Sequence, residues 1–185
     1  MPLPQIVRDS PLAEEILASH RDRAGGDEVG WGAYRAHVYR VINFARALGP
    51  DASGADDADR DEKLAIGAAF HDLASFTTLD YLVPSIQAQD AWLRRTGRAL
   101  WSDELALVVA QHHRLLPYSQ KRPFAPLVEA VRRADLIDVS QGLIRCRPDR
   151  SAACGAPPRT TGFPAPWQRI DPLRSSGSGS LIPAI

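Results

Sequence analysis

Hydrophobic residues recur at steps of three and four from about Ser10 to Ser140, which is the period of amphipathic α-helices. The clearest such stretch covers residues 31–48, and Gly49-Pro50 is a typical end for that helix. No stretch of useful length alternates between apolar and polar residues, as a half-buried strand would. The pattern therefore predicts an all-α fold.

Further helices are expected on both sides of this stretch. Ser10 offers a capping hydroxyl directly before Pro11, so a first helix should begin there and end at Gly25-Gly26. Residues 64–70 are nearly all apolar, and a helix over about 62–74 should therefore be deeply buried. The remaining expected helices cover about 84–97, 102–113 and 126–140.

The last forty residues differ in composition from the rest of the chain. From Cys146 onward there are seven prolines, four glycines and five serines, but no lysine and no glutamate. A segment without an amphipathic period cannot bury enough apolar surface to offset the entropy lost on ordering. We therefore expect a helical domain over residues 1–145 and an irregular tail over 146–185.

The overall charge and length limit the classes of partner. A chain of 185 residues suits one domain with one core. Lysine plus arginine and aspartate plus glutamate both number 22, so nothing in the net charge favours nucleic acid or an anionic membrane surface. No apolar run approaches the ~20 residues that a spanning helix needs. The expected partner is a small molecule.

The N-terminus and the cysteines indicate a cytoplasmic protein. The first residues lack a basic region followed by an apolar core, so no signal peptide is predicted. Cys146 and Cys154 have neither a CxxC spacing nor a histidine nearby. They are typical of free thiols in a reducing compartment.

Four of the five histidines form an ordered pattern with two aspartates. His37 comes first, followed by the pair His71-Asp72, the pair His112-His113, and finally Asp135. Imidazole nitrogens and carboxylate oxygens are preferred ligands of divalent metals. A lone histidine on a helix is more often structural, and an isolated His-Asp pair carries almost no information. In this order, on separate predicted helices, they indicate a metal site.

The order H…HD…HH…D resembles the HD-domain superfamily of metal-dependent phosphohydrolases, over roughly residues 31–141. The resemblance implies an HD-type helical bundle that holds one divalent ion, such as Zn, Mn, Fe, Co or Mg. Its metal ligands would be His37, His71, Asp72 and Asp135. Asp138 lies one turn after Asp135 and could orient a ligand histidine.

The same resemblance gives roles to residues outside the ligand set. Histidines at the position of His112 and His113 either hold a second metal or contact substrate phosphate, and Arg114 follows them directly. Dinuclear members use a further histidine between the His-Asp pair and this region. No histidine lies between Asp72 and His112, so one metal is favoured.

Catalytic roles are expected for Asp72, His112 and Arg40. Asp72 would hold the metal and orient its water. Arg40 lies one turn after His37 and could fork onto a phosphate group.

Three functions remain open at this stage. The first is hydrolysis of a phosphoester in a small metabolite or nucleotide by metal-activated water. The second is hydration of a small nitrile-like substrate, because the superfamily also resembles cyanamide hydratases. The third is a non-catalytic, metal-stabilised binding domain. An Arg40 or Arg114 side chain pointing into the metal site would favour a phosphorylated substrate, because phosphate needs cationic anchors.

Overall fold

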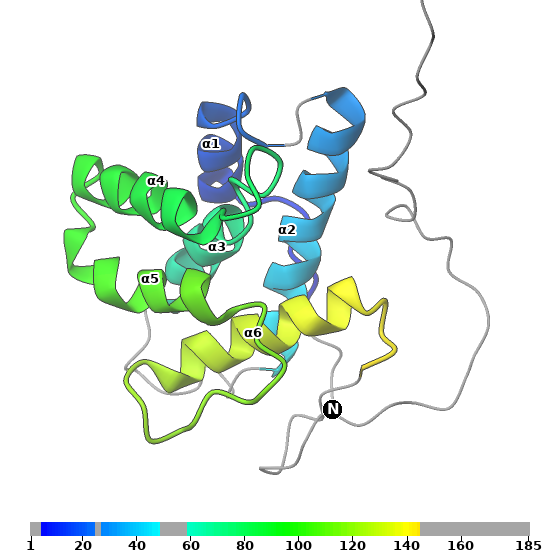
Figure 1. Cartoon of the computed structure of the whole chain (residues 1–185), viewed down its shortest axis with the longest axis vertical. Helices are drawn as coiled ribbons and strands as arrows, with labels where there is room; N and C mark the ends of the chain where they lie inside the picture. The colour runs from blue at the N-terminus through cyan, green and yellow to red at the C-terminus, as the bar shows by residue number, and fades with distance from the viewer. Residues whose placement is uncertain (1–4, 25–26, 49–58, 145–185) are drawn as a thin grey trace, which may run out of the picture.

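The computed structural model describes residues 5–24, 27–48 and 59–144 (Figure 1). These residues form six α-helices and one 3-10 helix, and no strand occurs among them, so the predicted all-α fold is confirmed. The helices are α1 (Pro11–Ser19), α2 (Glu28–Leu48), α3 (Arg60–Phe70), α4 (Leu82–Arg95), η1 (Ala99–Trp101), α5 (Ser102–Gln111) and α6 (Ala125–Val139).

Helix α1 begins as predicted but ends early. The Ser10 side chain accepts a hydrogen bond from the Ala13 amide, and Pro11 occupies the first turn. The expected end at Gly25-Gly26 is wrong, because the helix stops at Ser19. There the Ser19 hydroxyl and the His20 ring both bond to the Ile16 carbonyl. Side chains that compete for a helix carbonyl in this way favour termination.

Helix α3 is the centre of the bundle. It lies against each of the other five α-helices, and Figure 1 shows it surrounded by them. Every residue from Leu64 to Phe70 is buried, as its all-apolar sequence predicts. At Gly67 the neighbouring α5 approaches so closely that an added Cβ would lie 3.1 Å from Val108. The helix that leads to His71-Asp72 is therefore held from all sides.

The chain leaves α3 sooner than the sequence pattern suggests. The helix ends at Phe70, and residues 71–77 form consecutive turns with bonds such as Leu73 N to Phe70 O and Ser75 N to Asp72 O. His71 and Asp72 therefore lie on a tight turn directly past the helix end. Helix α2 packs against α6 along one side of this turn.

Several sequence predictions fall outside this description. The Gly49-Pro50 helix end, both cysteines and the whole expected tail lie outside the described residues. Within the described part of the chain, no helix combines the length and apolar character needed to cross a membrane.

Candidate metal centre

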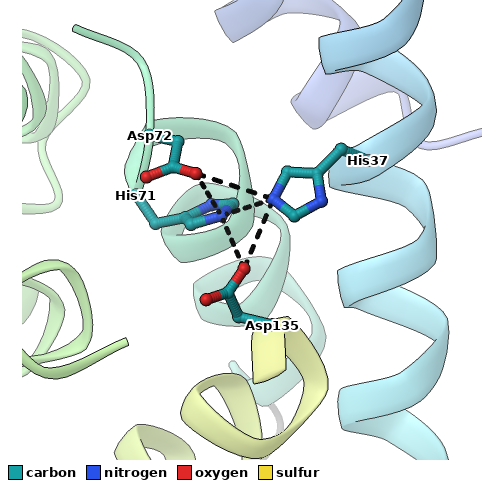
Figure 2. A group of neighbouring side chains, drawn as sticks. All are labelled: His37, His71, Asp72 and Asp135. Carbon is teal, nitrogen blue, oxygen red and sulfur yellow. Dashed lines mark hydrogen bonds and ion pairs between the residues drawn. The ribbon is translucent and has the colours of Figure 1, made fainter. Parts of the chain in front are cut away.

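Four side chains from three separate elements meet at one point. His37 comes from α2, His71 and Asp72 from the turn after α3, and Asp135 from α6 (Figure 2). Each offers one ligand atom, and these four atoms all lie within 4.8 Å of one another. The residues predicted to hold a metal are thus brought together by the fold.

The spacing of the four atoms fits a small divalent ion. The two histidine Nε2 atoms are 2.8 Å apart, and Asp135 Oδ1 lies 3.5 Å from His37 Nε2 and 3.6 Å from His71 Nε2. Asp72 Oδ2 lies 3.8 Å and 3.6 Å from the same two nitrogens. Ligands of a tetrahedral site with bonds near 2.1 Å are about 3.4 Å apart.

Both imidazole rings present a lone pair to the centre. His37 Nδ1 is 2.6 Å from a carboxylate oxygen of Asp138, and His71 Nδ1 is 2.8 Å from the Ala68 carbonyl. Each of these partners accepts a hydrogen, so each Nδ1 carries one and each neutral ring keeps its Nε2 lone pair. Two such lone pairs 2.8 Å apart repel unless a proton or a metal ion lies between them.

The carboxylates of the cluster also favour a bound cation. Asp135 is buried, and its Oδ1 has no hydrogen-bond donor among the described residues. Burying an unpaired carboxylate oxygen is costly, and a coordinated metal removes that cost. Two imidazole nitrogens and two carboxylate oxygens are a ligand set that zinc, manganese or iron accepts. The residues present therefore fit a divalent ion.

The charges in the cluster favour positive charge on His71. Burial lowers the pKa of His71, but the carboxylates of Asp72 and Asp135 outweigh burial and raise it from 6.5 to about 9. Burial raises the pKa of Asp72, but His71 and His112 outweigh it and hold this pKa well below its usual range. In metal-free protein a proton on His71 can occupy the place that a metal would take.

Asp138 and Arg40 lie behind His37, on the side away from the centre. The Asp138 carboxylate accepts from His37 Nδ1 at 2.6 Å and from Arg40 Nε at 2.5 Å and Nη2 at 3.0 Å. Burial raises the pKa of Asp138, but these bonds to His37 and Arg40 outweigh it and lower the pKa. Asp138 thus orients the His37 ring, as expected. The Arg40 guanidinium binds the Asp138 carboxylate, and not an open position where a phosphate could bind.

The His112-His113 pair is divided by the fold. His112 is buried, its Nδ1 is 2.7 Å from the Val109 carbonyl, and its Nε2 lies 3.1 Å from Asp72 Oδ1. His113 and Arg114 are both exposed. Asp72 therefore directs Oδ2 to the four-atom cluster and Oδ1 to His112. Of His112, His113 and Arg114, His112 is the residue whose side chain contacts the cluster.

One residue of this region was missed by the sequence reasoning. The Tyr81 hydroxyl lies 3.3 Å from His112 Nε2, directly before α4. Burial and the charge of Asp72 raise the pKa of Tyr81 above its usual range, so its hydroxyl keeps its proton at neutral pH. The only signal in the sequence was a tyrosine shortly after the His-Asp pair, and such a residue is ordinarily assigned to packing.

Asp72 is the most exposed residue of the cluster. The side chains of His37, His71 and Asp135 are almost fully buried, whereas 23% of the Asp72 side chain is exposed. The half-buried Tyr81 and the exposed His113 lie next to His112, which contacts Asp72, with ring centroids 6.0 Å and 5.1 Å from that of His112.

Comparison with known proteins identifies the family. The family model described as "HD domain" matches residues 34–140, which is more than half of the chain. The chain therefore belongs to the HD domain family. Its members bind divalent metals and are generally metal-dependent hydrolases. No curated protein and no solved structure gives a match.

Proposed function

We propose that this HD domain is a metal-dependent hydrolase that cleaves a phosphoester in a small metabolite or nucleotide. The observation that carries the proposal is the convergence of His37, His71, Asp72 and Asp135, with no hydrogen-bond donor satisfying Asp135 Oδ1. A divalent ion bound there would supply a Lewis acid that polarises a phosphoryl oxygen and lowers the pKa of a bound water.

The residues around the cluster have separable tasks. His71 and Asp135 close the buried side and exclude water from it. Asp138 fixes the ring of His37, so that Nε2 points at the centre. Asp72 lies at the more exposed edge of the cluster, where its carboxylate can orient an attacking water. His112 Nε2, 3.1 Å from Asp72 Oδ1, is placed to hold or donate a proton to the departing oxygen.

The alternative reaction, hydration of a small nitrile-like substrate, draws support from the arginines. The Arg40 guanidinium donates hydrogen bonds to Asp138, and the Arg114 side chain is exposed. A neutral substrate needs no cationic anchor, so this arrangement suits it as well. A non-catalytic binding domain would use the same four ligands without turnover.

Assay of purified, metal-loaded protein distinguishes the three functions. We expect hydrolysis of at least one member of a phosphoester panel, with no hydration of small nitriles. Asp72→Ala should lower the hydrolytic rate by about a hundredfold or more, because a methyl group can neither ligate metal nor orient water. The matched control is Asp80→Ala, at an exposed position before α4.

Circular dichroism should show that both variants keep the helical fold. An Asp72→Ala protein that hydrolyses near the wild-type rate at equal metal content would refute the assignment of Asp72. Nitrile hydration without phosphoester cleavage would replace the proposed reaction with the alternative, and the absence of both would favour the binding domain.

A further inference from the structure

We propose that Tyr81 contacts the substrate, and that its hydroxyl donates a hydrogen bond to a phosphoryl oxygen at the open edge of the metal centre. This inference rests on the proposed phosphohydrolase function and names a substrate-binding group for it. Tyr81 comes directly before α4, an element that contributes none of the four candidate ligands.

The first support is the position of the Tyr81 hydroxyl beside Asp72. His112 Nδ1 faces the Val109 carbonyl at 2.7 Å, and its Nε2 lies 3.1 Å from the buried Asp72 Oδ1. The Tyr81 hydroxyl lies 3.3 Å from the same Nε2, so it lies next to the carboxylate of a candidate metal ligand.

The second support is that the contact of this hydroxyl with His112 is long. A separation of 3.3 Å from His112 Nε2 is long for a hydroxyl donor, whose bonds are usually near 2.7–2.8 Å. The hydrogen of a phenol rotates freely about the C–O bond, so it can turn to a better acceptor. A charged phosphoryl oxygen is a strong acceptor, as is the Asp72 carboxylate to which this hydroxyl also bonds.

The third support is location. Tyr81 is half-buried and lies on the side where Asp72 is exposed, whereas the opposite side of the cluster is closed by His71 and Asp135. A phosphate group that reaches the centre from solvent would therefore pass Tyr81. The carboxylates of Asp72 and Asp135 repel an anion, and Arg40 is engaged with Asp138. A neutral donor at this edge offsets part of that repulsion.

The test is Tyr81→Phe in the full-length, metal-loaded protein, because this change removes one oxygen and keeps the ring. Tyr39→Phe is the matched control, since the Tyr39 hydroxyl bonds Glu14 and the Ser10 amide, outside the metal cluster. The measurements are the Kd of inorganic phosphate by calorimetry, KM and kcat for a phosphoester that the wild type hydrolyses, and bound metal per chain.

We expect Tyr81→Phe to raise the Kd of phosphate and KM by roughly tenfold or more, because a hydrogen bond to a charged group is lost. Metal content and melting temperature should equal those of Tyr39→Phe. Unchanged Kd and KM would overturn the inference and leave the proposed function intact. A fall in kcat alone, or a loss of metal, would also overturn it, because Tyr81 would then act through His112 or Asp72. A wild-type protein that neither binds phosphate nor hydrolyses a phosphoester would refute the proposed function itself.

Discussion

At the scale of single residues, the orientation of each imidazole ring is set by the partner of its Nδ1 atom. For His37 that partner is Asp138, and for His71 it is the Ala68 carbonyl. Both rings therefore turn Nε2 toward the same point (Figure 2). The sequence offered this role for Asp138 because of its spacing from Asp135. It could not show that Arg40 binds the same carboxylate, since that pairing depends on how α2 packs on α6.

The adjacent residues His112 and His113 show that sequence spacing does not determine which side chain is buried. From the sequence, His112 and His113 were both candidates for a second metal or for contact with substrate phosphate, and His112 was also a candidate catalytic residue. Neighbouring positions at a helix end point about 100° apart, so one ring can enter the core while the next enters solvent. In the structure His112 is buried beside Asp72, whereas His113 is exposed. The packing of α5 on α3, α4 and α6 decides which of the two faces the centre.

Asp138→Asn should weaken divalent-metal binding by about 10–100-fold, because an amide no longer fixes the ring of His37 as a carboxylate does. Competition with a chromogenic chelator measures this affinity. Asp90→Asn, which alters an exposed pair with Arg94 on α4, is the control and should bind metal like the wild type. If Asp138→Asn and Asp90→Asn bind metal equally well, Asp138 does not support the site.

The stability of metal-free protein should fall as pH rises. The pKa of His71 in the folded state is raised to about 9 from 6.5. A raised pKa contributes stability that is fully present below pH 6.5 and is lost as pH rises through about 9. Bound metal displaces this proton, so metal-loaded protein should not show the loss.

Melting temperatures measured across this pH range, in chelator and in excess metal, check the sign. The metal-induced increase in Tm should grow toward pH 9. Two parallel curves would mean that His71 does not exchange a proton for a metal.

At the scale of elements, α3 determines where the His-Asp pair lies. Its all-apolar stretch was predictable from the sequence, and so was its burial. Its end at Phe70 was not, because no glycine or proline marks the change from helix to turn. The turn is specified by tertiary contacts, such as the Ser85 hydroxyl that accepts from the Ala74 amide. Local sequence cannot reveal such contacts.

Gly67→Val should destabilise the fold by about 1–3 kcal/mol, because new methyl groups would enter the close contact between α3 and α5. Gly32→Val is the matched control, since a Cβ at that exposed position of α2 meets nothing within 4 Å. Denaturant unfolding of the two variants compares their free energies. Equal stability would show that α3 and α5 are not tightly packed at Gly67.

At the scale of the whole molecule, the site exists only when α2, α3 and α6 are packed together. The order of the histidines and aspartates sufficed to predict the family and the four converging residues. It could not predict that the cluster is closed on the side of His71 and open at Asp72, since that depends on the full arrangement of helices. Metal binding should accordingly stabilise the fold, because the ligands are together only in the folded state.

Equilibrium binding of a divalent metal, by calorimetry on chelator-stripped protein, tests the central claim most directly. Zinc or manganese should bind the wild type at one ion per chain, with release of protons near neutral pH. Asp135→Ala should lose this binding, while Asp80→Ala should retain it. Absence of stoichiometric binding by the wild type, or equal binding by Asp135→Ala, would contradict a metal centre built from His37, His71, Asp72 and Asp135.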